Sequence, residues 1–338
     1  MDYFLNKIFL DGKLSLDFTV SDIFASLQNN LKNVETDCMT PLLSEICHEL
    51  DAACVGWRLP LKEEVPSGVE PSDCILCRRC ADGREISLVA VEMLPGYSRV
   101  VDGIVSYPVI YESKHEAPIV ILRDRWERNR EMILSRMMAH LGVFRQVYAR
   151  NCEIRRIDKP TAADFLAKYH SYGDASCKYR YGMYLLRSTG AKNSRLIAPG
   201  TLVAVSSFSS PRRWHKGDGV ISSYEWTRYA SLPDVRICGG MGKMLQYFID
   251  EVGPDDIMSY ADVEWSEGMV YKSLGFMDEG HHAPVDFEID CSRWTRRPLA
   301  SRKANTAPEL MEVTPTTGNT IIYRAPGSIK YRLKLTAY

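Results

Sequence analysis

The sequence has no long apolar run and no export pattern. No stretch of the 338 residues reaches the roughly 18 consecutive apolar residues that a membrane-spanning helix needs. The first residues, MDYFLNKIFLDGKLSLDF, carry charges that interrupt the apolar positions before the hydrophobic region of a secretory signal can form. We therefore expect no membrane span and a cytoplasmic location.

The chain also lacks an excess of charge of either sign. It has 42 Lys and Arg residues against 43 Asp and Glu residues, a formal net charge of −1. No global basic field therefore indicates nucleic acid, although a local basic patch stays possible. Ten cysteines in a large chain without an export signal are expected to be reduced thiols rather than a disulfide framework.

Two familiar phosphate-binding motifs are absent, namely the Walker loop GxxxxGK[ST] and the dinucleotide loop GxGxxG. The sequence instead has Gly239-Gly240-Met241-Gly242-Lys243, followed at once by an apolar-periodic run over residues 244–249. Glycines let a backbone approach a pyrophosphate closely, and a helix that begins there offers unpaired N–H groups. The same residues are also consistent with a plain strand-to-helix turn that needs glycine.

Length and pattern predict two domains, residues 1–146 and 147–338. In the first, we expect helices at 23–31 and 42–50, a loop at 61–84, strands at 85–93 and 118–122, and a helix at 126–141 that ends at Gly142. In the second, we expect helices at 161–170, 243–252 and 267–274, and strands at 147–157, 179–186, 201–208, 222–230, 256–262, 319–323 and 329–335. This order predicts an α/β layer fold with a mixed sheet.

The glycine loop, its helix, the strand at 256–262 and the segment Tyr271-Lys272-Ser273-Leu274-Gly275-Phe276 together resemble the acyl-CoA N-acyltransferase superfamily, the Gcn5-related (GNAT) fold. The resemblance implies that acetyl-CoA or another acyl-CoA is the donor. It also implies that Tyr271 lies near the leaving thiolate and that five residues hold the cofactor: Arg236, Gly239, Gly240, Gly242 and Lys243. The family's usual form, Arg/Gln-x-x-Gly-x-Gly/Ala, is met only in part.

A narrower resemblance spans residues 148–280. It is to a transferase-like module of phage and mobile-element proteins described as homing endonucleases, a group similar to Mom-type DNA-adenine modification proteins. It implies a DNA-linked role, with DNA or another nucleic acid as a partner. In that family the module often follows a very-short-patch-repair-type endonuclease domain, for which Glu92 and Asp102 are the candidate carboxylates. Because a third metal ligand is missing, a degenerate, non-catalytic α/β domain is the alternative.

Several polar residues flank the expected cleft. His170 ends a helix, where it is either a general base or a histidine that caps the helix C-terminus. Glu225 is a candidate catalytic acid or a structural buried carboxylate, and Arg228 is a candidate substrate ligand. Their spacing places the two on opposite faces of a strand unless a bulge intervenes.

The end of the next strand supplies the remaining candidates. Asp262 is placed to orient an amine or to take its proton, since ligands bind at the carboxyl ends of strands in α/β sheets. Ser266 is either a substrate ligand or a helix N-cap, and Trp265 either stacks on a base or closes the core. Tyr260 belongs to the same motif and is a candidate substrate ligand.

Cysteine spacing and basic clusters complete the candidates. Cys74, Cys77 and Cys80 share two C-x2-C spacings, which are weak zinc candidates against the alternative of free thiols. Arginines crowd the helix at 126–141 and its entry, and a run of cations with one tryptophan lies in an expected loop at 212–216. The leading hypothesis is an acyl-CoA-dependent transferase, and the alternatives are a DNA-binding or DNA-modifying protein and an active nuclease.

Overall fold

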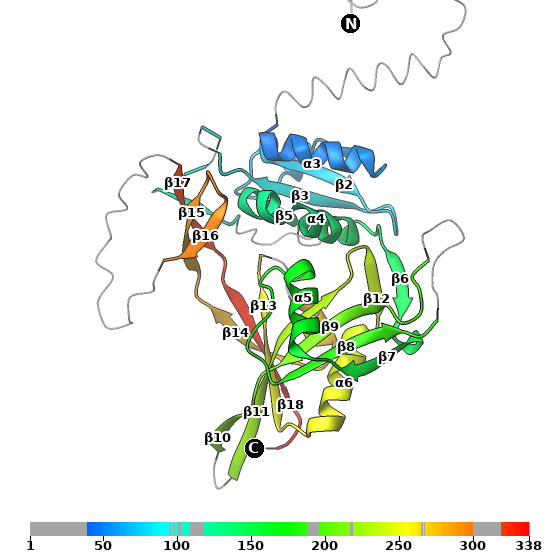
Figure 1. The fold of residues 1–338 in the computed structure, drawn as a ribbon. Helices are drawn as coiled ribbons and strands as arrows, with labels where there is room; N and C mark the ends of the chain where they lie inside the picture. Colours follow the sequence, from blue (N-terminus) through cyan, green and yellow to red (C-terminus); the bar gives the residue numbers. More distant parts are fainter. Residues whose placement is uncertain are drawn as a thin grey trace, which may run out of the picture.

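A computed structural model describes residues 39–94, 96–97, 99–100, 103–108, 118–187, 196–216, 219–264, 266, 268–299 and 319–337. The helix expected at 23–31 lies outside these residues. Two lobes stand one above the other, with α helices and strands in both (Figure 1). Among the helices of the described ranges, none is long and apolar enough to span a membrane.

The first lobe is built on a four-stranded sheet. Its strand order is β1-β2-β3-β5, with β3 antiparallel to β2 and parallel to β5. One face of the sheet packs against α3 and α4 through a shared apolar cluster. The bounds are α3 Pro41–Ala52, β1 Trp57–Arg58, β2 Cys74–Arg78, β3 Glu85–Val91, β5 Ile119–Leu122 and α4 Arg123–His140.

The predicted strands at 85–93 and 118–122 and the predicted helices at 42–50 and 126–141 are confirmed within a few residues, but the loop expected at 61–84 is wrong at residues 74–78. Residues 74–77 form most of β2 because both faces of that strand are covered, which turns a short apolar run into a core strand. The loop prediction followed the charged and Gly/Pro-rich residues around that run. Gly142 ends α4 as expected, with a φ of +83° and its N–H bonded to the carbonyl of Ala139.

A second four-stranded sheet joins distant parts of the chain, in the order β16-β15-β17-β4. It packs on the face of the first sheet that the helices leave open, where Val89 and Leu122 meet Ile289 and Tyr323. Part of the C-terminal tail therefore shares a core with the first lobe, while the domain division at 146/147 stays a prediction. The bounds are β4 Ile104–Ser106, β15 Val285–Asp290, β16 Thr295–Pro298 and β17 Thr320–Ala325.

The second lobe contains one large mixed sheet in the order β14-β18-β13-β11-β9-β8-β7, with β10 paired to β11. All neighbouring pairs are antiparallel except β11 and β13, which run parallel. The bounds are β7 Cys152–Arg156, β8 Tyr179–Leu185, β9 Leu202–Phe208, β10 Arg212–Lys216, β11 Gly219–Ser231, β13 Asp256–Asp262, β14 Met277–His282 and β18 Ser328–Lys334. The predicted mixed α/β architecture is confirmed.

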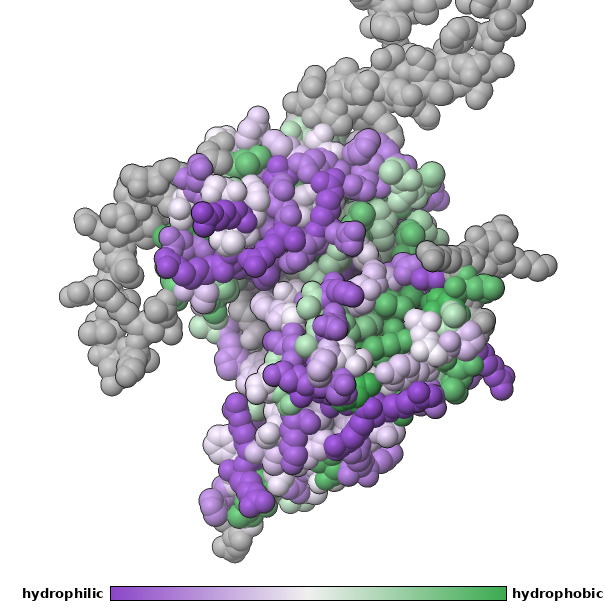
Figure 2. Space-filling view, in the orientation of Figure 1, coloured by the Kyte–Doolittle hydropathy of each residue, from purple (hydrophilic) through white to green (hydrophobic). Residues whose placement is uncertain are grey.

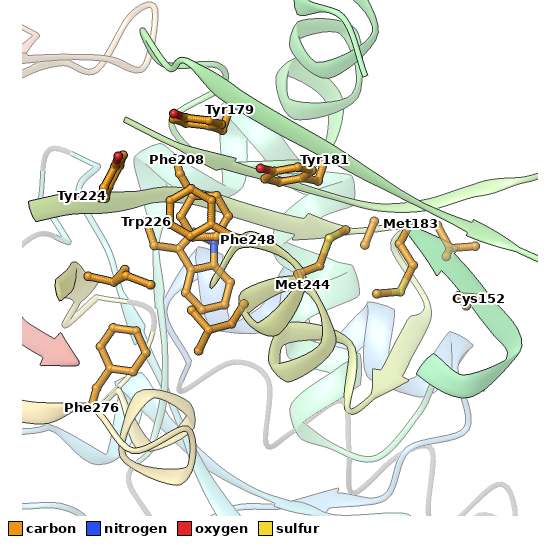
Figure 3. Close-up of a cluster of buried hydrophobic side chains, with 14 of the residues drawn as sticks. Cys152, Tyr179, Tyr181, Met183, Phe208, Tyr224, Trp226, Met244, Phe248 and Phe276 are labelled. Atoms are coloured by element: carbon orange, nitrogen blue, oxygen red, sulfur yellow. The ribbon is translucent and has the colours of Figure 1, made fainter. Parts of the chain in front are cut away.

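Helices cover both faces of this sheet. On one face, α6 (Gly240–Val252) contributes Phe248, whose ring stacks on Phe208 with centroids 3.9 Å apart. Figure 3 shows the side chains of β8, β9 and β11 converging on that ring, among them Tyr181 and Trp226. On the other face, α5 (Lys159–Tyr169) packs on β9 and β11. The short α7 (Met269–Ser273) lies beyond β13.

Three details of this lobe differ from the predictions. The strand expected at 147–157 is two strands, β6 (Arg145–Tyr148) and β7, separated by one 3₁₀ turn. β6 pairs instead with β12 (Val235–Cys238), which leads into α6. The loop expected at 212–216 is strand β10, because every residue of it pairs along β11. Strand β14, like β15 and β16 of the sheet that packs on the first lobe, carries too many polar residues for the pattern analysis to have found it.

Candidate active site

The central feature of the site is a fork between two parallel strands. β11 and β13 pair only at Ser223↔Asp256, Tyr224↔Ile257 and Glu225↔Met258. Beyond this point β11 continues along β9 and β13 continues along β18, both of them within the described residues. The facing edges of residues 226–231 and 259–262 therefore have no strand between them, and an extended ligand could form backbone hydrogen bonds there.

A β-bulge lies where the fork opens. The register along β9 shifts between Trp226 and Arg228, so Thr227 is the extra residue. Trp226 and Tyr229 both face the α6 side, with their rings 6.2 Å apart. Thr227 and Arg228 both face the other side, where they contact residues 173–177. Glu225, two residues before Thr227, therefore shares a face with Arg228.

The glycine loop forms a helix N-terminus directly beyond the fork. Gly239 has a φ of +75°, and the first bond into α6 runs from the N–H of Lys243 to the carbonyl of Gly239, at 3.0 Å. The N–H groups of Gly240, Met241 and Gly242 therefore have no intrahelical acceptor and point out of the helix. A Cβ on Gly240 would lie 2.8 Å from Ile237. Packing alone thus requires glycine at position 240, whether or not a ligand also requires it.

The two cations of the predicted cradle have different surroundings. The Lys243 ammonium donates to the carbonyls of Cys152 at 2.5 Å and Ala149 at 3.1 Å, so two of its three protons are engaged within the chain. A direct phosphate contact by Lys243 would have to compete with these bonds. Arg236 is exposed on β12, with its guanidinium 5.2 Å from the centre of the Phe144 ring. Arg236 is thus the more available charge.

Tyr271 lies at the fork on the α6 side. Its hydroxyl lies 2.9 Å from that of Ser259, the first β13 residue beyond the paired segment, and its ring stacks on Tyr331. The Ser259 hydroxyl has two acceptors at 2.9 Å, the Tyr271 hydroxyl and the carbonyl of Trp226, and donates its single proton to one of them at a time. Burial raises the pKa of Tyr271, which keeps the phenol protonated.

His170 lies on the opposite side of the sheet, at the end of α5. Its Nδ1 accepts the N–H of Tyr172 at 3.1 Å. Burial, together with the charges of Arg228 and Arg136, lowers the pKa of His170 to about 4. The ring is therefore neutral near pH 7, and because Nδ1 accepts, the ring proton sits on Nε2. In this state His170 is a hydrogen-bond donor through Nε2, which disfavours the predicted role of general base.

Asp262 is positioned by two hydrogen bonds at the end of β13. It accepts the hydroxyl of Tyr172 at 2.5 Å and the N–H of Glu264 at 3.0 Å. Tyr260, two residues earlier, shares its strand face and is 39% exposed. Since Glu225 opposes Met258 on the neighbouring strand, Glu225, Tyr260 and Asp262 all lie on the α5 side of the fork.

The remaining candidates of this motif are divided. Ser266 accepts the N–H of Gly268 at 3.0 Å, and Gly268 is the residue that caps α7. Ser266 thus supports the start of α7, which is close to the role of helix N-cap that the sequence analysis gave as one of its two alternatives. Trp265 lies outside the described residues. Sequence reasoning missed Tyr172 and Ser259 as site residues, because neither stands at a distinctive spacing and only the fold brings them to the fork.

The first lobe contacts this side of the fork through α4. The Arg125 guanidinium lies 5.4 Å from the centre of the Tyr172 ring and 3.3 Å from a carboxylate oxygen of Glu264. Arg296 of β16 binds Asp124 through two hydrogen bonds and Glu264 through a third. Hydrophilic side chains cover most of the visible face of the first lobe around α4 and β16 (Figure 2).

The residues considered for a zinc site or a nuclease site do not converge on a metal position in the described residues. Cys74 and Cys77 are buried in two different apolar clusters on opposite faces of β2, so one ion cannot be held by both, and Cys80 is exposed. In the described ranges, no group of three or more His, Cys, Asp or Glu residues converges on a metal position. Glu92 accepts the N–H groups of Leu42, Met93 and Leu94, which makes it an anchor for α3. Asp102 lies outside the described residues.

No family model and no curated protein matches the chain. Among solved structures, it is similar to a chain of a NatC complex bound to Gag peptide and CoA (13% identity, 55% of this chain and 99% of that one, TM-score 0.30). It is also similar to a Corynebacterium glutamicum protein described as histone acetyltransferase HPA2 and related acetyltransferase (10%, 56% and 98%, TM-score 0.31). A third is the Escherichia coli ribosomal-protein-S18-alanine N-acetyltransferase (13%, 55% and 96%, TM-score 0.27). With such TM-scores these likenesses identify no function.

Proposed function

We propose that the second lobe is a GNAT-type N-acyltransferase that takes an acyl group from an acyl-CoA and transfers it to an amine. The observation that carries this proposal is the fork between β11 and β13, together with the N-terminus of α6, which follows β11 in the chain after the short strand β12 and has no side-chain cap. An extended arm that contains amides suits the open edges of the fork. A pyrophosphate suits the unpaired N–H groups and positive dipole end at residues 240–242.

The two sides of the fork divide the chemistry. The amine enters on the α5 side and attacks the thioester carbonyl, which forms a C–N bond and breaks the C–S bond. The leaving thiolate takes a proton from Tyr271 on the α6 side, because this phenol is protonated and lies at the fork. Asp262 or Glu225 takes the proton that the amine loses. Backbone N–H groups near the bulge at Thr227 polarise the carbonyl.

The cradle offers a sharp test, because Gly239 has a left-handed φ that Asn and Asp tolerate best among other residues. A Cβ there would lie no closer than 3.8 Å to Ala149, so both substitutions fit. We expect acetyl-CoA to raise the melting temperature of the native chain and of Gly239→Asn. Gly239→Asp places a negative charge beside the phosphates and should abolish that shift.

The outcomes of this test separate donor binding from general damage. Equal melting temperatures of the two unliganded variants would show that both fold. No shift of the native chain at millimolar acetyl-CoA, or an equal shift in both variants, would contradict the proposed cradle. Acyl transfer itself is then measured by the release of the CoA thiol when an amine is present.

A nucleic acid as the bearer of the acceptor amine is a second candidate, favoured by β10. This strand forms a hairpin arm with β11 that projects from the lower end of the sheet (Figure 1). Arg212, Arg213 and His215 are exposed on it, and Trp214 is 50% exposed. Cations interleaved with an aromatic suit a phosphate backbone and stacked bases. The measurement is the retention of the chain on immobilised DNA. Retention that weakens steeply with salt and is lost in the double variant Arg212→Gln/Arg213→Gln would support this candidate. Retention that changes neither with salt nor in the double variant would exclude it.

A further inference from the structure

Arg228 is held in place but not neutralised. Its Nε donates to the carbonyl of Gly173 at 3.0 Å and its Nη1 donates to the carbonyl of Thr227 at 2.7 Å. No ion pair joins it to a carboxylate of the described residues, and it is only partly exposed. A guanidinium has five N–H donors, so three of them are left after these two bonds.

Two other poorly exposed arginines, Arg296 and Arg332, differ in this respect. Arg296 is paired with Asp124 and Glu264, and Arg332 is paired with Asp256 and Glu279. Withdrawing a cation from water costs free energy unless an anion or several acceptors compensate for it. Two carbonyls compensate in part for Arg228, and they also fix the plane of its guanidinium.

The position of Arg228 is on the acceptor side of the fork. It follows the bulge directly and lies on the face that carries Glu225 and Asp262. Its guanidinium is 5.9 Å from the centre of the Tyr172 ring, whose hydroxyl binds Asp262. A fixed cation therefore lies beside the candidate base that would receive the proton of an incoming amine.

We infer that the acceptor amine carries an oxyanion, a carboxylate or a phosphate, which Arg228 binds while the amine reaches the fork. This inference rests on the proposed acyl transfer. A planar guanidinium that presents a pair of N–H groups matches the two oxygens of a carboxylate or phosphate. Arg228 then determines which amines are used, while Asp262 or Glu225 takes the proton from whichever amine is bound.

Arg228 could instead only anchor residues 170–177 through its bond to Gly173, and two variants separate these roles. Arg228→Lys keeps the positive charge but not the fixed planar fork, whereas Arg228→Gln removes the charge. An anion-binding role predicts that Arg228→Lys keeps part of the preference for anionic amines and Arg228→Gln loses it. A purely structural role predicts that both variants lower the activity toward anionic and neutral amines alike. Arg297→Gln, an exposed change on β16, is the control.

The experiment compares matched amines with acetyl-CoA as the donor. Phosphoethanolamine is paired with ethanolamine, and β-alanine is paired with 3-aminopropanamide, so the two pairs distinguish phosphate from carboxylate. We expect kcat/KM to favour the anionic member of at least one pair by about tenfold to hundredfold, mainly through KM. Arg228→Gln should reduce the ratio to near one, while Arg297→Gln should leave it unchanged. Equal use of both members by the native chain would overturn the inference.

A binding measurement without donor keeps this inference separate from the proposed function. Calorimetric titration of phosphoethanolamine and of β-alanine should show binding that Arg228→Gln abolishes. Anion binding that depends on Arg228, without any thermal shift by acetyl-CoA, would leave the anion site standing and contradict the acyltransferase. A thermal shift by acetyl-CoA, without anion binding by the native chain, would support the acyltransferase and overturn the anion site.

Discussion

The two sides of the fork between β11 and β13 are built from different materials. On the α6 side, backbone N–H groups and buried aromatic rings form the surroundings of Tyr271 and the glycine loop. On the α5 side, charged and polar groups from α4, β11, β13 and the turn at 170–177 meet around Tyr172. The backbone groups on the α6 side suit a ligand whose structure stays the same. The side chains on the α5 side can be substituted without changing the fold, so that side can adapt to different ligands.

The largest expected effect breaks the α6 side. Phe248 is fully buried and stacks on Phe208 at 3.9 Å, so Phe248→Ala leaves a cavity beneath the sheet. We expect a loss of about 3–5 kcal/mol in the free energy of unfolding, measured by urea denaturation. Tyr247→Ala on the same helix, at a position 37% exposed, should cost much less. Similar losses for the two would contradict the assigned core.

The next effect concerns the α5 side. Arg296→Met leaves Asp124 and Glu264 buried without their shared partner, although Arg125 still pairs with Glu264. We expect destabilisation by about 3 kcal/mol, at the lower end for a broken buried pair. Arg297→Met breaks only an exposed pair with Glu288 and should cost roughly 0–1 kcal/mol. A small effect of Arg296→Met would show that this network does not join the lobes as described.

Tyr271→Phe tests the proton donor with little change in shape. We expect kcat to fall about hundredfold, because the leaving thiolate loses its acid. The thermal shift by acetyl-CoA should persist, since the cradle is untouched. The lost bond to Ser259 should cost only about 1 kcal/mol of stability. A variant with normal kcat would exclude Tyr271 as the acid and leave a water or the solvent in that role.

The last expected effect is a dependence of stability on pH that belongs to the α5 side. The pKa of His170 is about 4 in the folded chain and near 6.5 when unfolded. Between these values the unfolded chain binds the extra proton, so the free energy of unfolding falls as the pH drops from 6.5 to 4. Urea titrations of His170→Gln should show a shallower fall over that window, with His215→Gln on β10 as the control. An unchanged slope would contradict the described burial of His170.

The sequence predicted one side of the fork better than the other. The glycine loop, its helix and the Tyr271 segment are close in sequence, and local chemistry at residues 239–242 dictates a helix N-terminus there. Glu225 and Arg228 both lie on β11 next to the fork, and the bulge at Thr227 decides which face they share. No local pattern predicts a bulge, since it arises from pairing with β9.

The α5 side of the fork could be described only from the tertiary structure. Tyr172, Arg125 and Arg296 come from three segments that only tertiary packing brings beside Asp262. The same holds for β15 and β16, whose polar residues hid them and whose sheet shares a core with the first lobe.

What the sequence determined by itself is much of the local structure: apolar periodicity placed the strands and helices that have a clear apolar face, and the glycines at 239–242 placed a helix start. The tertiary structure alone decided the fork, its bulge and the charges on the acceptor side. The physical reason is range. The hydrogen bonds within a helix or a turn and the periodicity of apolar residues involve residues a few positions apart, whereas the pairing of β11 with β13 and the contacts of α4 join residues many positions apart.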